Sequence, residues 1–354
     1  MRAYVVERFA ERLVTEERPA IQPTGTEVVL EVEGCGVCHT DLHLWDGYYE
    51  LGGGKRLQLA DRGIRPPLVL GHEVLGRLVR KGPDAPIDDS AIGRSFIIYP
   101  WLGCGKCEDC MLGRENLCAW PNSIGVARAG GYADECLVPH SDYLVDATGI
   151  EPNLAATYAC SGLTAYSALR KVAIDHDDLL LIVGLGGVGY SGLLIAQALG
   201  FRRIVVADID PRKRDLARGV EGVTVLDPQS EADRAVLAEM GPVAGAVDFV
   251  GVTSTAEFAI GSLRKGGIAV IVGLFGGDIT LPLVPLVQRS TTVRGSYVGT
   301  LDELRELVAL AQTGRLAALP VETVPFDDVN DALDRLRGGG VAGRLVLSNS
   351  TDAS

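Results

Sequence analysis

A thiol, two imidazoles, a hydroxyl and a carboxylate lie within six residues of one another, from Cys38 to His43. Thiolate and neutral imidazole are good zinc ligands, and the neighbouring oxygens can orient a ligand or hold a substrate. An isolated cysteine–histidine pair can equally belong to an ordinary polar loop. The segment is therefore a candidate metal site whose remaining ligands must come from elsewhere in the chain.

A second candidate ligand follows the apolar run that starts at Leu68. The run leads into Gly71-His72-Glu73, where a histidine could simply be a hydrogen-bonded core residue. Because Cys38 already offers a thiolate, His72 becomes a plausible second ligand. Glu73 then lies beside it as an outer or alternate oxygen ligand.

Four further cysteines are crowded into one short stretch, with two, two and seven residues between them: Cys104, Cys107, Cys110 and Cys118. Four thiolates can surround one zinc ion and leave no open position, which is typical of a structural site. An iron–sulfur cluster is the alternative, although Cys118 lacks the following proline of the bacterial ferredoxin run. Cys35 and Cys136 have no partner at ligand spacing and are expected to be structural thiols.

The bulk properties limit the class of protein. A chain of 354 residues with 47% hydrophobic residues favours two domains. A formal net charge of −13 argues against nucleic acid and anionic membranes as partners. The sequence lacks both a signal-peptide pattern and an apolar run of about 20 residues. We therefore expect a cytoplasmic protein with reduced thiols.

The part before residue 150 has a β-rich pattern. Residues 26–32 alternate as a half-buried strand and lead directly to Cys38. Residues 46–67 form a long connection, either a cover over a pocket or a surface excursion. Residues 154–169 have helical spacing, which we expect to be broken at 159–162, around Cys160.

Beyond this point strands and helices alternate. An apolar strand at 179–183 runs into Gly-Leu-Gly-Gly-Val-Gly, and Asp208 ends the next strand. The residues of this glycine run that we expect to bind a dinucleotide are Gly184, Gly186, Gly187, Val188 and Gly189. A strand before the run, a helix after it and an acid at the ribose are typical of a Rossmann fold. Asp208 would repel a 2′-phosphate, so NAD is favoured over NADP, and Asp210 is expected to cap the next helix.

The strands expected up to residue 295 complete one parallel sheet, and the elements after them lie outside it. Strands are expected at 246–251, 266–273 and 291–295. Helices at 301–313 and 326–337 and a strand at 343–347 follow. Because the sheet would then be full, we expect this tail to rejoin the first domain.

Five motifs occur in one order: Gly36-Val37-Cys38-His39-Thr40-Asp41, Gly71-His72-Glu73, the four-cysteine run, Cys160-Ser161-Gly162, and the glycine run with Asp208. In these the chain resembles the zinc-dependent alcohol dehydrogenases of the medium-chain dehydrogenase/reductase superfamily. The connection before Pro67 and Tyr99-Pro100-Trp101 are most similar to a tetrameric bacterial and archaeal branch. The resemblance implies an α/β protein with a GroES-like catalytic domain (1–161 and 298–354), a Rossmann domain (162–297) and a homotetrameric assembly.

The resemblance also implies roles at the metal. Cys38, His72 and Cys160 would hold a catalytic zinc, with Glu73 as an exchangeable ligand, and residues 104–118 would hold a structural zinc. Thr40 would hydrogen-bond the substrate oxygen, His43 would pass the proton to solvent, and Asp41 would orient the zinc-bound imidazole. Zinc would act as a Lewis acid on the bound alcohol, and NAD would accept the hydride.

The remaining implied contacts are to the cofactor. His39 and Arg344 would contact the pyrophosphate, and Lys213 would join Asp208 at the adenosine ribose. Thr164 would lie near the nicotinamide, whose amide Gly273 and Leu274 would line.

The sequence specifies the substrate less closely than the metal and the cofactor. Candidates for an apolar pocket are the aromatic residues Trp45, Tyr49, Trp101 and Phe275, which favour medium-chain, cyclic or aromatic alcohols. Lys55 and Arg56 could instead meet the carboxylate of an ω-hydroxy acid, and a secondary-alcohol or polyol enzyme is a further alternative. A zinc-free quinone reductase and a non-catalytic binding protein are other hypotheses, against which the complete ligand set argues.

Overall fold

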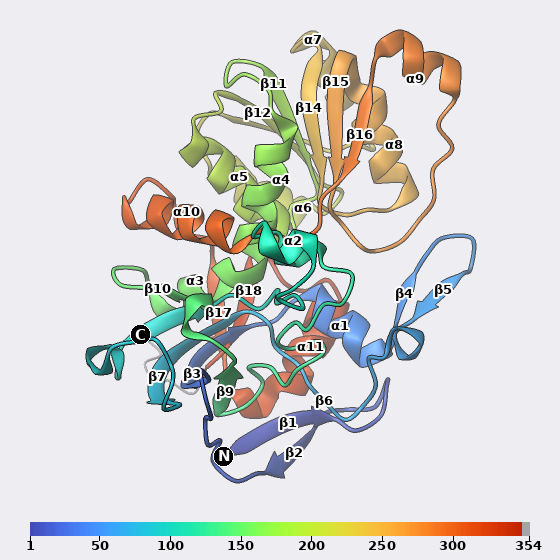
Figure 1. Ribbon diagram of the computed structural model, residues 1–354. Coiled ribbons are helices and arrows are strands. Elements are labelled where there is room, and N and C mark those ends of the chain that lie inside the picture. Colours follow the sequence, from blue (N-terminus) through green and yellow to red (C-terminus); the bar gives the residue numbers. More distant parts are fainter. Residues whose placement is uncertain (349–354) are drawn as a thin grey trace.

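The computed structural model describes residues 1–348, which form two bodies stacked on one another (Figure 1). The upper body in this view is a parallel sheet covered by helices on both faces. The lower body is built from mostly antiparallel strands between Arg2 and Asp146 together with the C-terminal segment. This is the expected α/β class, and the division at 161/162 and 297/298 stays a prediction.

The parallel sheet has the strand order β13-β12-β11-β14-β15-β16. Its strands are β11 (Leu179–Val183), β12 (Arg203–Ala207), β13 (Val223–Leu226), β14 (Val243–Asp248), β15 (Leu263–Ile271) and β16 (Thr292–Gly295). Its helices are α5 (Gly187–Leu199), α6 (Pro211–Arg218), α7 (Glu231–Glu239), α8 (Thr253–Ser262) and α9 (Leu283–Arg289). The chain changes direction across the sheet between β11 and β14, which is where a Rossmann sheet binds its ligand.

The sheet agrees with the sequence patterns except at strand ends. The β14 strand begins at Val243 and not at 246, and β15 begins at Leu263 and not at 266. The short β13 was not predicted. The central β11 is buried along its whole length, since all five of its residues are apolar and both faces are covered.

The lower body contains a sheet of order β10-β8-β7-β3-β18-β17, with β9 also paired to β3. Its strands are β3 (Val28–Gly36), β7 (Val74–Lys81), β8 (Ser95–Ile98), β9 (Glu135–Val138), β10 (Leu144–Asp146), β17 (Val321–Val324) and β18 (Arg344–Leu347). Three further strands form the sheet β2-β1-β6, and two form a hairpin: β1 (Arg2–Val6), β2 (Val14–Glu17), β6 (Leu68–Val69), β4 (Tyr48–Glu50) and β5 (Arg56–Gln58).

The first of these strands corrects a sequence interpretation. The alternation over 26–32 indicated a half-buried strand, but Val28, Val29 and Leu30 are all fully buried. The reason is that β3 is central and pairs with β7, β9 and β18. The pairing with β18 confirms that the tail rejoins the first part of the chain.

The helix that carries Cys160 is continuous. It consists of α3 (Pro152–Thr157), a π-helical turn η5 (Tyr158–Gly162) and α4 (Leu163–Val172). The predicted break at 159–162 is therefore a widened turn. Such π-turns are frequent at functional sites, because they redirect side chains without ending the helix.

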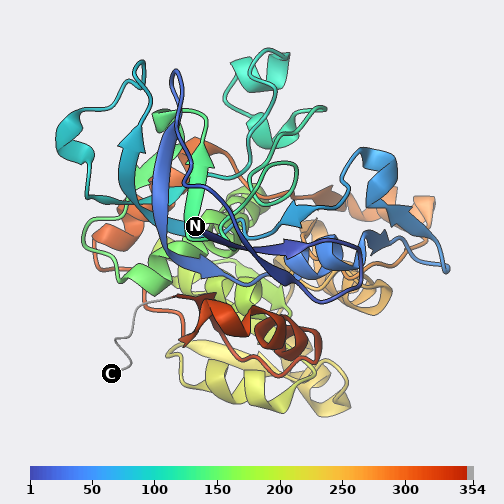
Figure 2. The same ribbon diagram turned by 90° about the horizontal axis from the view of Figure 1, so that it is seen from below.

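The C-terminal segment contains α10 (Leu301–Gln312), η6 (Phe326–Asp328) and α11 (Val329–Arg337). In Figure 2 the dark-red helix α11 lies between the blue N-terminal elements and the yellow-green part of the Rossmann body. The other short helices are α1 (His39–Asp46), η1 (Leu59–Arg62), η2 (Asp89–Ala91), α2 (Glu108–Met111), η3 (Glu115–Leu117) and η4 (Ser141–Tyr143). Among residues 1–348, no helix has the length and apolar character that crossing a membrane requires.

Candidate active site

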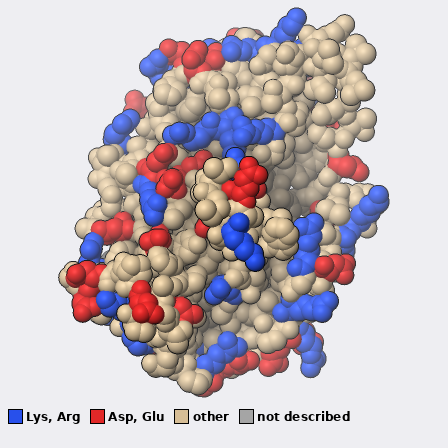
Figure 3. Space-filling model, in the orientation of Figure 1, with Lys and Arg blue, Asp and Glu red and all other residues tan. Residues whose placement is uncertain are grey.

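A cavity of about 340 Å³ lies between the two bodies. Its wall combines the start of α1, the π-helical turn, the glycine run and the ends of several Rossmann strands. Figure 3, in the orientation of Figure 1, shows a hollow between the two bodies, with acidic and basic side chains mixed around it. The sequence motifs that are far apart in the chain therefore meet in one place.

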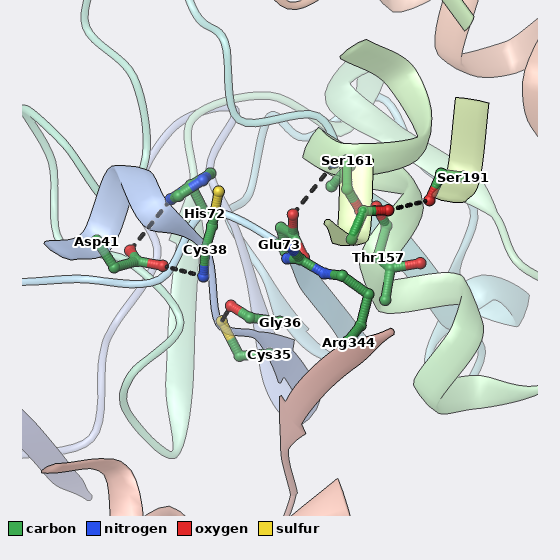
Figure 4. A network of polar contacts seen from close by, with 12 residues as sticks. Cys35, Gly36, Cys38, Asp41, His72, Glu73, Thr157, Ser161, Ser191 and Arg344 are labelled. Atoms are coloured by element: carbon green, nitrogen blue, oxygen red, sulfur yellow. Dashed lines mark hydrogen bonds and ion pairs between the residues drawn. The ribbon is translucent and has the colours of Figure 1, made fainter. Parts of the chain in front are cut away.

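Cys38, whose backbone is extended, is the N-cap of helix α1, which begins at His39. Asp41 completes the cap, because its Oδ2 accepts a hydrogen bond of 2.9 Å from the Cys38 N–H. The same fully buried carboxylate accepts from the Tyr132 hydroxyl and the Gly71 N–H, and its Oδ1 lies 3.2 Å from His72 Nδ1 (Figure 4). Asp41 thus fixes two candidate ligands relative to one another.

The candidate ligand atoms of Cys38, His72, Glu73 and Cys160 all lie within 4.8 Å of one another, and all four residues are buried. His72 Nε2 has no hydrogen-bond partner among residues 1–348. A buried imidazole nitrogen without a partner is costly unless something else binds it. Two thiols and one imidazole nitrogen are the donors of a catalytic zinc site with one open position, so this cluster fits zinc.

The two thiols of this cluster influence each other's protonation. Their mutual hydrogen bond lowers the pKa of Cys38 well below its ordinary value, and it raises the pKa of Cys160 well above. A thiolate is the form that binds metal, and metal binding would release the remaining proton.

Glu73 is held just behind the cluster. Its Oε1 accepts a 3.1 Å hydrogen bond from the Ser161 N–H of the π-helical turn, and its Oε2 pairs with the buried guanidinium of Arg344 (Figure 4). Burial raises the pKa of Glu73 to about 7, against the opposing effect of the Arg344 charge. Arg344 also lies against the glycine run, since a Cβ on Gly187 would come within 2.3 Å of its Cδ.

The second cysteine group forms a lobe around α2 and η3, residues 103–120, hereafter the four-cysteine lobe. Its four sulfur atoms lie within 4.8 Å of one another, with Cys107 Sγ 3.4 Å from Cys110 Sγ and 3.7 Å from Cys118 Sγ. Tetrahedral zinc with Zn–S bonds of about 2.3 Å separates its sulfur ligands by about 3.8 Å. The spacing therefore fits one ion, whereas a cluster of several iron atoms would spread the sulfurs further apart.

Cys107→Ser should lower the melting temperature first and the activity second, because a closed four-thiolate site contributes folding energy and no chemistry. Zinc content should fall from two ions per chain to one. The control is Cys136→Ser, which alters a buried thiol outside both groups and should destabilise the chain without zinc loss. Thermal unfolding beside metal analysis tests this; an unchanged melting temperature in Cys107→Ser would contradict a structural role.

The glycine run joins β11 to α5 as the Rossmann pattern requires. Gly184 has φ +88°, and a Cβ on Gly189 would lie 1.8 Å from the Gly184 carbonyl oxygen. A Cβ on Gly186 would meet no atom within 4 Å, so the cavity is open there to a close-lying ligand. The cavity wall includes all five expected residues of the run: Gly184, Gly186, Gly187, Val188 and Gly189.

Asp208 lies at the end of β12 and its side chain faces the glycine run. Its Oδ2 accepts a 2.6 Å hydrogen bond from the Leu185 N–H, and its Oδ1 accepts one of 2.8 Å from the Asp210 N–H. Lys213 and Asp208 both line the cavity. Asp210 caps α6 through the Arg212 N–H, with Pro211 at the first helical position, as the sequence indicated.

The first turns of α1 present His39, Thr40 and His43 to the cavity. The His39 ring centre lies 4.8 Å from that of Phe275, and the His43 ring lies 4.5 Å from Tyr49. Burial lowers the pKa of His39 to about 4, and burial also lowers the pKa of His43. Both imidazoles are therefore neutral at pH 7.

Thr164, Gly273 and Leu274 also line the cavity. The Thr164 hydroxyl is buried and has no hydrogen-bond partner in the described part of the chain. Such a group, facing a cavity, is available to a ligand.

The four aromatic residues expected to line the substrate pocket fall into two groups, three that line the cavity and one that does not. Tyr49, Trp101 and Phe275 line the cavity, and the Trp101 indole N–H donates to the Ala159 carbonyl at 3.0 Å. Trp45 corrects the sequence expectation, because it is buried outside the cavity wall. Its indole N–H donates to the Glu11 carbonyl, and the Arg337 guanidinium lies 4.3 Å from its ring centre.

Sequence reasoning missed Tyr297 and Val298, which also line the cavity. They lie two and three residues after β16, beyond the carboxyl end of a Rossmann strand. That position was the available signal, since ligands bind at the carboxyl ends of such strands.

Comparisons with known proteins identify the kind of domain that each part of the chain forms. The profile of the alcohol dehydrogenase GroES-like domain matches residues 24–148, and that of the zinc-binding dehydrogenase matches residues 187–313. An NAD-dependent alcohol dehydrogenase of Sulfurisphaera tokodaii is 32% identical, over 98% of this chain and 99% of its own. The alcohol dehydrogenase structure from Aeropyrum pernix superposes with a TM-score of 0.86, at 26% identity, over 98% and 100% of the two chains. An acetophenone reductase from Geotrichum candidum, solved with NAD, gives 0.84 at 29% identity over 99% and 98%.

Proposed function

The chain belongs to the zinc-dependent alcohol dehydrogenases of the medium-chain dehydrogenase/reductase superfamily, and from this we propose that it oxidises an alcohol with NAD at a zinc ion. The observation that carries the proposal is that the Cys38–His72–Cys160 cluster opens into the same cavity as the glycine run. A metal site and a dinucleotide site that share one cavity can bring an alcohol carbon beside a hydride acceptor.

Cys38, His72 and Cys160 would hold the zinc, with Asp41 orienting the His72 ring through its Nδ1 side. Bound there, zinc supplies Lewis acidity that lowers the pKa of an alcohol, and NAD supplies the hydride acceptor. Thr40 positions the substrate hydroxyl from the first turn of α1. His43, one turn further and neutral, takes up the proton and releases it toward solvent.

The cofactor lies along the glycine run in this proposal. The open space over Gly186 and the N-terminus of α5 receive the pyrophosphate, with His39 and Arg344 beside it. Asp208 accepts hydrogen bonds from the adenosine ribose, supported by Lys213. Thr164 and the Gly273–Leu274 backbone lie at the nicotinamide end.

We propose an aromatic or cyclic alcohol, or one of medium chain length, as substrate. Tyr49, Trp101 and Tyr297 give the metal end of the cavity an aromatic wall, which suits a ring better than ethanol or a sugar. The likeness to an acetophenone reductase is in line with this class. Arg56 is already engaged, pairing with Glu50 at 2.9 Å and lying 3.9 Å from the Tyr48 ring centre, so an ω-hydroxy acid has less support.

A panel of ethanol, hexanol, cyclohexanol, benzyl alcohol, an ω-hydroxy acid and a pentose, each with NAD and with NADP, tests the substrate class. We expect benzyl alcohol and cyclohexanol to give kcat/KM values at least about tenfold above ethanol, since each additional buried CH₂ contributes about 0.8 kcal/mol. NAD should be preferred throughout. A pentose or ethanol as the best substrate would contradict the aromatic-pocket assignment while leaving the reaction class intact.

A further inference from the structure

One wall of the cavity is a strained segment. Residues 296–300 carry the chain from β16 back to α10, and the first three of them, Ser296, Tyr297 and Val298, line the cavity. Val298 has φ +38°, a conformation that is a genuine outlier for a β-branched residue. Such a backbone persists only where the surrounding structure fixes it.

Three side chains fix this segment from three directions. Lys171 Nζ donates to Ser296 Oγ at 2.8 Å, Asn116 Nδ2 donates to the Tyr297 carbonyl at 3.0 Å, and the Tyr99 hydroxyl donates to the Gly299 carbonyl at 2.9 Å. The last two flank Val298 on either side. The position of the Tyr297 ring, 5.9 Å from Trp101, therefore depends on these hydrogen bonds.

Two of the three restraints lead back to the four-cysteine lobe. Asn116 belongs to its helical turn η3. Its neighbour Glu115 accepts a 3.0 Å hydrogen bond from the Tyr143 hydroxyl, and the Tyr143 ring packs beside Tyr99 at 6.4 Å. Two adjacent residues of η3 thus contact the segment 296–300 in different ways. Asn116 binds it directly, and Glu115 supports it through Tyr143 and Tyr99.

We propose that Asn116 is a positioning residue for the substrate cavity, and that the four-cysteine lobe sets the shape of the alcohol site through the Asn116–Tyr297 hydrogen bond. This inference rests on the proposed function only in that its kinetic test measures alcohol oxidation. Asn116 does not line the cavity; it acts through the backbone of Tyr297, whose ring lines the cavity and lies edge-on against Trp101. It is therefore a determinant of selectivity among alcohols and not of the hydride transfer itself.

Asn116→Asp tests the proposal, because an aspartate has the same shape but cannot donate to a carbonyl. The ratio of kcat/KM for benzyl alcohol to that for ethanol should fall about fivefold, the size expected for one lost hydrogen bond. NAD affinity and zinc content should not change. Asn122→Asp is the matched control, since it makes the same charge change near the lobe and its side chain makes no hydrogen bond in the described residues. Asn116→Ala provides a second variant should the new charge disturb folding.

A second experiment tests whether Asn116 acts through Tyr297. In a Tyr297→Ala background, Asn116→Asp should no longer change the benzyl-to-ethanol ratio, because residues that act through one another are non-additive. Crystal structures of wild type and Asn116→Asp should show a displaced Tyr297 ring, whether or not any alcohol is turned over. An unmoved Tyr297, or the same loss of selectivity with and without Tyr297, overturns the inference. Absence of turnover in the wild type would contradict the proposed function alone.

Discussion

Cys38→Ser should lower kcat/KM for every alcohol by at least about 10³-fold, because the Lewis acid contributes several kcal/mol to the reaction. Serine is a poor zinc ligand, and the remaining His72 and Cys160 would hold the ion weakly. Zinc content should fall from two ions per chain to one. NAD affinity should stay within about twofold of the wild type, since Cys38 itself makes none of the proposed phosphate and ribose contacts.

Cys35→Ser is the matched control for this variant. Cys35 is buried in β3, three residues before Cys38, and belongs to neither cysteine group. It should keep both zinc ions and most of the activity. Loss of NAD binding together with turnover in Cys38→Ser would show that the metal site and the cofactor site are not separable in the way that the cavity indicates.

Asp208→Ala should shift the ratio of kcat/KM values toward NADP on the order of 10²-fold. The substitution removes hydrogen bonds to the ribose and a negative charge that would repel a 2′-phosphate. The Asp208 carboxylate also accepts from the N–H groups of Leu185 and Asp210. NAD binding should therefore weaken in addition, because the glycine run loses part of its support.

Asp210→Ala separates these effects. Asp210 caps α6 and pairs with Arg212, which lowers the pKa of Asp210 to about 2. Its loss should reduce stability without changing the cofactor preference. Steady-state kinetics with both dinucleotides decide the matter, and an unchanged preference in Asp208→Ala would show that the ribose is bound elsewhere.

The sequence predicts the metal-binding and cofactor-binding residues where they lie close together in the chain. The four-cysteine run and the glycine run each lie within one short continuous stretch of the chain, so their spacing alone indicates a geometry. The meeting of Cys38, His72 and Cys160 is different, because the three residues lie on separate elements. Only the resemblance to a family brought Cys160 into that set.

Helix α1 explains the error at Trp45. Residues four apart on a helix share a face, so His39 and His43 both reach the cavity. Trp45 lies two residues beyond His43 and therefore points away, into the contact with Arg337. The helical periodicity of this segment therefore excludes the tryptophan from the face that His39 and His43 share.

Other features depend on contacts that no local pattern encodes. The buried pair of Glu73 and Arg344 joins residues 271 positions apart. The full burial of Val28 and Val29 reflects three strands that pair with β3, and the π-helical turn at Cys160 carries no glycine or proline signal before residue 162. In each case tertiary packing decided what the sequence pattern left open.

The central claim is that one cavity brings an alcohol at zinc beside NAD. It is tested most directly by mixing the purified wild-type chain, loaded with two zinc ions, with NAD and benzyl alcohol, and following NADH formation by absorbance. We predict zinc-dependent NADH formation that disappears in Cys38→Ser under the same conditions. A wild-type chain that binds both zinc ions and NAD but forms no NADH with any alcohol of the panel would contradict the account.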